Sequence, residues 1–169
     1  MSTEYEKFLA SAPEAQREYR TIEIYHSQLS QTFRLVKDYV NRTFMLESDA
    51  PRDPSTLQTF TAVSMELTEP SENLDAEQIL TVNLGTVGSE IQEELNAING
   101  DGLFEPIQIV YRKYYSGSLN EPVLILKLSI SDVNFDSYTQ VTLTCQDLDI
   151  SNKSSGKLYT LEDFPGLAD

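Results

Sequence analysis

Apolar and polar residues alternate with a period of two in most segments between Ile22 and Leu148. This spacing places apolar side chains on one face of an extended backbone and polar side chains on the other, so it is typical of half-buried β-strands. Turn-forming Gly, Pro, Asn, Asp and Ser residues separate the alternating segments, as expected for a β-rich domain. The predicted strands are residues 22–25, 33–36, 43–46, 58–67, 78–84, 105–115, 123–135 and 138–148.

One segment repeats instead with the period of a helix. Its apolar residues are spaced i, i+4, i+8 and i+11, and they are Val87, Ile91, Leu95 and Ile98. Ser89 and Gln92 have the spacing of a capping box near the start of this segment, and Asn99-Gly100-Asp101-Gly102 follows its end. We therefore predict an amphipathic helix over residues 87–98 that packs its apolar stripe on the sheet.

The length of 169 residues is that of one domain. We predict a mainly β fold with α: an antiparallel β-sandwich or split barrel with one flanking helix and a short N-terminal helix. Residues 1–19 are the N-terminal helical arm, residues 20–150 the sandwich that carries helix 87–98, and residues 151–169 a docked tail. Docking is expected because the tail is too apolar for a solvated segment; its apolar residues include Tyr159, Leu161, Phe164 and Leu167.

The charge is distributed unevenly. From Asp53 to Tyr111 the chain contains fifty-nine residues without lysine or arginine, and eleven carboxylates, which supply most of the net charge of −15. Clustered cations provide much of the affinity for nucleic acids and anionic membranes, so the composition argues against specific binding of either. A solvated acidic face with no further role is the simplest alternative.

No targeting or membrane segment is expected. The N-terminal residues MSTEYEKFLA lack the apolar core of a signal peptide. No apolar run approaches the roughly 20 residues that a membrane-spanning helix needs. We therefore expect a protein that is made in the cytoplasm and is not inserted in a membrane.

Residues that commonly carry catalysis are scarce. His26 is the only histidine and has no Gly-x-Ser-x-Gly motif to accompany it, so we expect a surface histidine at a strand end. Cys145 is the only cysteine and is expected to be a buried thiol. The segment Gly85-Thr86-Val87-Gly88-Ser89 lacks the lysine and the third glycine of phosphate-binding loops. We predict no enzyme, no cofactor and no metal site. The aspartates that could supply oxygens to calcium, as an alternative, are Asp132 with Asp136 and Asp147 with Asp149.

An aromatic and basic cluster, Tyr111-Arg112-Lys113-Tyr114-Tyr115, ends one predicted strand. Tyrosine and arginine are enriched at protein interfaces because they bury a large area and keep a polar group. The candidate interface residues are Tyr111, Arg112, Tyr114 and Tyr115. An edge strand that its charges protect from pairing is the alternative, and both interpretations stay open.

An acidic turn connects segments 58–67 and 78–84, which we predict to form a β-hairpin. Glu69, Glu72 and Asp75 lie in this turn, and no lysine or arginine is near them in the sequence. We therefore expect a hairpin tip that is mobile in the free protein and becomes ordered on assembly.

Several motifs together resemble an uncharacterised family encoded among the minor tail genes of long-tailed phages and related prophages. These motifs are Pro106–Tyr114 (PIQIVYRKY), Glu121-Pro122 and the terminal Tyr159–Leu167 (YTLEDFPGL). Ile22–His26 and Phe33–Val36 also fit, so the resemblance extends from about Thr21 to Leu167. The family is similar to the tail-tube superfamily of phage proteins.

The resemblance implies a structural subunit of the tail tip or baseplate, a distal or minor tail protein in the virion tail. Such a protein forms a ring, a hexamer or a trimer, that is part of the DNA conduit and contacts the tail tube, tape measure and hub. A conduit for DNA requires a lining that does not bind phosphate, so Glu69, Glu72 and Asp75 are candidate lumen residues. The residues leave open a different function, a monomeric β-sandwich module that binds a small ligand.

Overall fold

The computed structural model describes residues 17–69, 79–85, 88–137 and 140–146. The predicted N-terminal helix and the predicted docking of the C-terminal tail lie outside these residues. The strands are β1 (Glu18–Tyr25), β2 (Phe33–Lys37), β3 (Arg42–Met45), β4 (Leu57–Val63), β5 (Met65–Thr68), β6 (Leu80–Leu84), β7 (Gln108–Tyr115), β8 (Leu124–Ser137) and β9 (Gln140–Gln146). The α-helix α2 (Gly88–Ala97) and the 3₁₀-helix η1 (Gly100–Phe104) connect β6 to β7.

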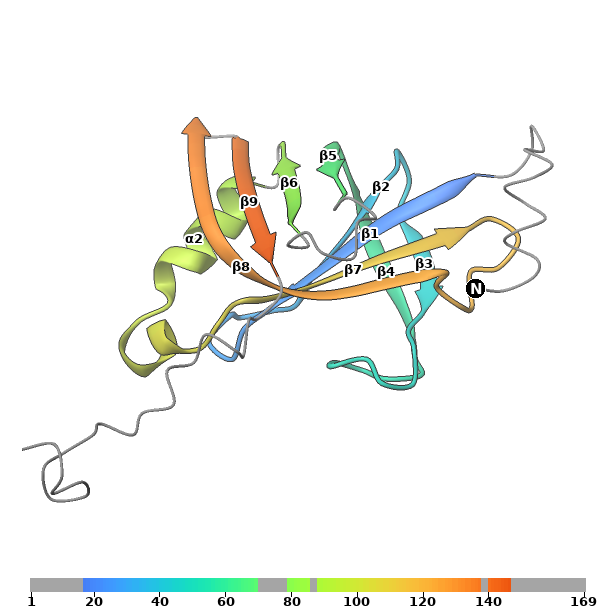
Figure 1. The fold of residues 1–169 in the computed structure, drawn as a ribbon, viewed down its shortest axis with the longest axis horizontal. Helices are drawn as coiled ribbons and strands as arrows, with labels where there is room; N and C mark the ends of the chain where they lie inside the picture. The colour runs from blue at the N-terminus through green and yellow to red at the C-terminus, as the bar shows by residue number, and fades with distance from the viewer. Residues whose placement is uncertain (1–16, 70–78, 86–87, 138–139, 147–169) are drawn as a thin grey trace, which may run out of the picture.

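The strands form one nine-stranded sheet in the order β3-β4-β2-β1-β7-β8-β9-β6-β5. Neighbouring strands are antiparallel, except for the parallel pair β2 and β4. The sheet does not close on itself, since β3 and β5 form its two ends. The prediction of a mainly β domain with a flanking helix is confirmed, in the form of an open, strongly curved sheet (Figure 1).

The long strand β8 makes this curvature possible. Its first half pairs with β7 and its second half with β9. The β8–β9 register shifts between Ile130 and Asp132 and again between Phe135 and Ser137. Such irregularities bend a strand and increase its local twist, and Figure 1 shows β8 curving away from β7 and upward beside β9.

The central strands β1, β2 and β7 are covered on both faces. Successive side chains of a strand point to opposite faces, and here odd and even positions enter two different cores. Ile22 and Ile24 of β1 belong to the first core, whereas Tyr19 of the same strand belongs to the second. These strands are therefore the middle layer of the fold.

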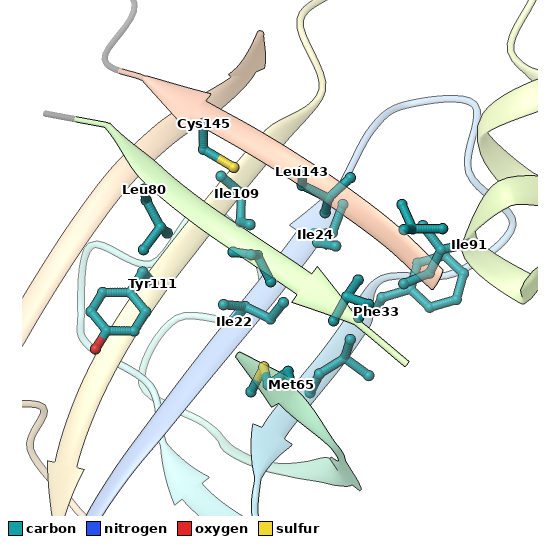
Figure 2. Close-up of a cluster of buried hydrophobic side chains, with 14 of the residues drawn as sticks. Ile22, Ile24, Phe33, Met65, Leu80, Ile91, Ile109, Tyr111, Leu143 and Cys145 are labelled. Carbon is teal, nitrogen blue, oxygen red and sulfur yellow. The ribbon is translucent and has the colours of Figure 1, made fainter. Parts of the chain in front are cut away.

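The first core lies between the central strands and β6, β9 and α2 (Figure 2). Ile22 and Ile109 of the central strands share this cluster with Leu143 of β9, and Ile91 reaches it from the helix. The second core contains the rings of Phe44, Phe60, Tyr114 and Tyr19. Phe44 stacks on Tyr114 with 4.5 Å between ring centroids and meets Phe60 edge-on at 5.5 Å, geometries that aromatic pairs favour.

The single strand predicted over residues 58–67 is wrong. The structure divides it at Ser64 into β4, which pairs with β2 and β3, and β5, which pairs with β6. The reason is a change of pairing partners: β4 lies between β2 and β3 near one end of the sheet, whereas β5 forms the other end beside β6. Only the β5 half forms the predicted hairpin with β6, and residues 70–78 of its tip are outside the described part of the chain.

The predicted helix is confirmed. Ile91 is fully buried, Ile98 is buried just after the helix, and Leu95 packs partly buried against the first core. Val87 lies outside the described residues. After α2 the chain continues into η1, and Gly100 adopts a φ of 57°, in the left-handed region that glycine tolerates best.

We predict that Ile91→Ala lowers the free energy of unfolding by about 2–5 kcal/mol, because it leaves a cavity between helix and sheet. Glu93→Ala on the exposed face of α2 is the matched control, with an expected change within about 0.5 kcal/mol. Chemical denaturation followed by circular dichroism measures both changes. Equal effects of the two substitutions would contradict the packing described for α2.

Candidate functional site

The aromatic and basic cluster of β7 is inside the protein. β7 pairs with β1 on one side and β8 on the other, and the four candidate interface residues are all buried: Tyr111, Arg112, Tyr114 and Tyr115. The expectation of an exposed interface and the alternative of an edge strand are therefore both wrong.

Arg112 is the centre of a buried network of charges. Its Nε and Nη2 donate to the two carboxylate oxygens of Glu47 at 2.7 and 2.8 Å, and its Nη1 donates to Glu23 Oε2 at 2.7 Å. The side chains of Arg112 and Glu23 are fully buried. Burial lowers the pKa of Arg112, but the hydrogen bonds and charges of Glu47 and Glu23 outweigh burial and raise the pKa above its ordinary value.

Arg34 extends this network toward the surface. Its Nε and Nη2 lie 3.0 Å from Glu23 Oε1, and its Nη2 lies 2.7 Å from Asp53 Oδ2. Glu23 therefore accepts from two arginines, and both of its carboxylate oxygens have partners. The network connects β1, β2 and β7 to the 46–56 segment between β3 and β4, so it serves as an internal clamp.

A second charge cluster contains the described part of the acidic turn. Glu69 accepts hydrogen bonds from Tyr111 Oη at 2.8 Å and Lys113 Nζ at 2.6 Å, and Arg20 Nε lies 3.2 Å away. The expectation that Glu69 has no cation near it is therefore wrong, because strand pairing brings β1 and β7 cations beside it. Glu72 and Asp75, the other candidate lumen residues, lie outside the described residues.

Burial raises the pKa of Glu69, but the hydrogen bonds from Lys113 and Tyr111 and the charges of Lys113 and Arg20 outweigh it. The pKa of this carboxyl is consequently held below its ordinary value. The ionised form of Glu69 thus stabilises the folded state.

His26 does lie at the end of β1, but it is buried rather than on the surface. The backbone N–H of Gln28 donates to its Nδ1 at 3.2 Å, and its Nε2 lies 3.1 Å from the carbonyl oxygen of Gly102. With Nδ1 accepting, Nε2 carries the proton and donates to that carbonyl. His26 therefore fixes η1 to the end of β1.

Two exposed apolar residues project from the segment that His26 holds. Leu103 is 70% exposed and Phe104 is 88% exposed. Asp101 and Glu105 flank them and are also exposed. We call Asp101, Leu103, Phe104 and Glu105 the knob.

A groove lies near the opposite end of β1. It has a volume of about 290 Å³ and is lined by residues 17–19, 37–39 and 63–65. Val63 and Met65 form part of its apolar wall, and the almost fully exposed ring of Tyr39 lies at its edge.

Most cations are occupied within the fold. Of the nine lysines and arginines that the structure describes, six form salt bridges with carboxylates: Arg20, Arg34, Arg42, Arg112, Lys113 and Lys127. Arg52 lies over the ring of Tyr25 at 5.4 Å. Arg17 and Lys37, the remaining two, have no salt bridge among the described residues, and both line the groove.

The other residues singled out by sequence have structural positions. Cys145 is buried as predicted, and burial raises the pKa of its thiol to about 12, which keeps it protonated at neutral pH. Among the described residues, no group of three or more His, Cys, Asp and Glu side chains is placed to hold a metal ion. Asp147 and Asp149 lie outside this part of the chain. No helix in the described ranges has the length and apolarity of a membrane span.

Comparison with known proteins identifies one family. The family described as "Domain of unknown function (DUF1833)" matches residues 5–159, which is most of the chain. No curated protein matches the sequence.

Arg112→Met is expected to lower the free energy of unfolding by about 3–5 kcal/mol, because it leaves Glu47 buried without its cation and Glu23 with Arg34 alone. Lys127→Met is the control, since Lys127 and Asp49 form an exposed pair whose loss costs at most about 1 kcal/mol. Urea denaturation at neutral pH compares the two. A loss for Arg112→Met no larger than for the control would mean that the network does not clamp the fold.

The lowered pKa of Glu69 predicts a pH dependence with a definite sign. A carboxyl with a lowered folded-state pKa stabilises the protein above its unfolded-state pKa, near 4.5, and loses this effect as the pH falls through the folded-state value. Glu69→Gln is therefore expected to be destabilising at about pH 7 and progressively less so below about pH 4.5. Denaturation of both proteins across this range tests it, and a stability difference independent of pH would refute it.

Proposed function

The chain belongs to the DUF1833 family, and from this premise we propose that it is a structural subunit of the tail tip of a long-tailed bacteriophage. In this role copies of the chain form a ring that is part of the conduit for DNA. The ring contacts the tail tube on one side and the tape measure and hub proteins within the tip. The protein is made in the host cytoplasm and then resides in the virion tail.

The distribution of charge is the observation that carries this proposal. Seven of the nine described cations are held by carboxylates or by an aromatic ring of the same chain. On α2, by contrast, Glu90 and Glu93 are exposed, and no lysine or arginine of the described residues forms a salt bridge with them. Such a face repels phosphates and lets a duplex pass without binding.

The ion pairs of Glu69 change which residues we propose to line the DNA conduit. Because Glu69 is paired with Lys113 and Arg20, it is a poorer source of repulsion than the unpaired carboxylates. We therefore assign the DNA-repelling face to α2.

The architecture supports a scaffolding role as well. The reactive side chains are used to hold strands together, as Arg112, Glu23 and His26 illustrate. The sheet has two ends, β3 and β5, and unpaired strand edges can be extended or covered by neighbouring subunits. The sequence motifs PIQIVYRKY and YTLEDFPGL supply the link to tail proteins in particular.

Deleting the gene from the phage or prophage that carries it tests the proposal. We expect the lysates to contain filled heads but few infectious particles, with tails absent or defective at the tip. Expression of the wild-type chain from a plasmid is expected to restore the titre. Electron microscopy and plaque counts measure the two effects, and a deletion that yields normal particles at full titre would refute a tail-tip role.

A further inference from the structure

We propose that copies of this chain associate head to tail, with the knob of one copy seated in the groove of the next. The inference rests on the proposed function, because a tail ring requires subunits that bind one another, and it names the surfaces that do so. The groove residues used in the argument are Arg17, Lys37, Tyr39, Val63 and Met65.

The knob has the composition of an interface anchor. Leu103 and Phe104 are adjacent, and they are 70% and 88% exposed. Single exposed apolar residues are ordinary, but adjoining ones bordered by polar residues indicate a binding surface. Asp101 and Glu105 provide that border on either side.

The knob is also held rigidly. The side-chain amide of Gln28 donates to Asn99 O at 3.0 Å and accepts from Asn99 N at 2.9 Å, while His26 contacts Gly102 O. A Cβ on Gly102 would lie 2.4 Å from the end of the Gln28 side chain, so a larger residue there would displace the Gln28 amide from Asn99. A loop fixed in this way loses little conformational entropy when it binds.

The groove offers an apolar wall of suitable size. Val63 and Met65 contribute to its lining, and Tyr39 is 99% exposed at its edge. Its volume of about 290 Å³ is near the lower limit for ligand pockets, which suits one or two large side chains. Phe104 can enter it while Leu103 covers the edge.

The charges of the two surfaces are complementary. The groove contains two carboxylates, and each forms a salt bridge with an arginine: Asp38 with Arg42 at 2.8 Å and Glu18 with Arg20 at 3.0 Å. Arg17 and Lys37 remain without a salt bridge among the described residues. The carboxylates that flank the knob supply the opposite sign, which steers association and fixes its register.

One molecule cannot join its own two surfaces. The groove begins at Arg17, just before β1, and the knob is fixed to His26, just after it. β1 has eight residues, which at about 3.3 Å each separate the two surfaces by roughly 25 Å. Figure 1 places η1 and the start of β1 at opposite ends of the molecule. Contacts between two different surfaces repeat head to tail and close into a ring when the rotation between copies permits.

Two variants, each lacking one surface, test this arrangement. The knob variant carries Leu103→Ser with Phe104→Ser, and the groove variant carries Arg17→Glu with Lys37→Glu. We expect the wild-type chain to form oligomers that grow with concentration, and each variant alone to lose them. An equimolar mixture of the variants is expected to form 1:1 pairs and nothing larger, because each pair uses one intact knob and one intact groove.

Sedimentation velocity and light scattering measure these masses, and circular dichroism checks that the variants fold. Leu57→Ser, at an exposed apolar residue outside both surfaces, is the control and is expected to leave oligomers unchanged. A wild-type chain that stays monomeric, a mixture without pairs, or a control that weakens association as much would overturn the inference. Such results would leave the tail-tip role intact, since a hub protein could arrange the subunits. Conversely, a gene deletion that yields normal particles would refute the tail-tip role but would leave a measured knob–groove contact standing.

Discussion

The guanidinium of Arg112 is the group on which the arrangement of the layers depends. It is fully buried and bonded to Glu47 and Glu23, so it joins β7 and β1 to the segment that follows β3. Removing a charge of this kind from water is costly unless every partner is in place. Alternative registers of β1 against β7 would separate these partners, and we infer that the network selects the observed register. The two apolar cores then fill the faces of a middle layer that the network has aligned.

Ion pairs within the chain also shape the electrostatics of the surface. A cation that pairs with a carboxylate of the same chain adds little net charge to the exterior, and six of the nine described cations pair in this way. Among the described residues, exposed carboxylates therefore lie on α2 and in the knob, and Arg17 and Lys37, which form no salt bridge there, lie beside one groove. Under the proposed function, the exposed carboxylates of α2 repel DNA, and the charges beside the groove contribute to contacts between subunits.

The sequence predicts the local elements of this fold well and the partners of its polar residues poorly. The period-two segments and the stripe through Ile91 identify strands and a helix because periodicity reflects burial directly. The break at Ser64 has no signal in the sequence, since the alternation continues while the chain changes its pairing partners from β2 and β3 to β6. Arg112 and Glu23 were also missed as a pair, because eighty-nine positions separate them. The sequence gives one indication that such a residue is buried in an ion pair: it is a charged residue inside an apolar strand, such as Glu23 between Ile22 and Ile24. His26 and the knob depend on packing between β1 and η1, which no local pattern encodes.

The central claim is that this chain forms a ring at the tip of a phage tail. Electron cryo-microscopy of tails from the phage that carries the gene tests it most directly, because an averaged map resolves the fold of each subunit around the tail axis. The account predicts a ring at the distal end of the tube in which each subunit fits the nine-stranded open sheet, with α2 toward the lumen. Tail tips in which no subunit has this fold, or virions that lack the chain, would contradict it.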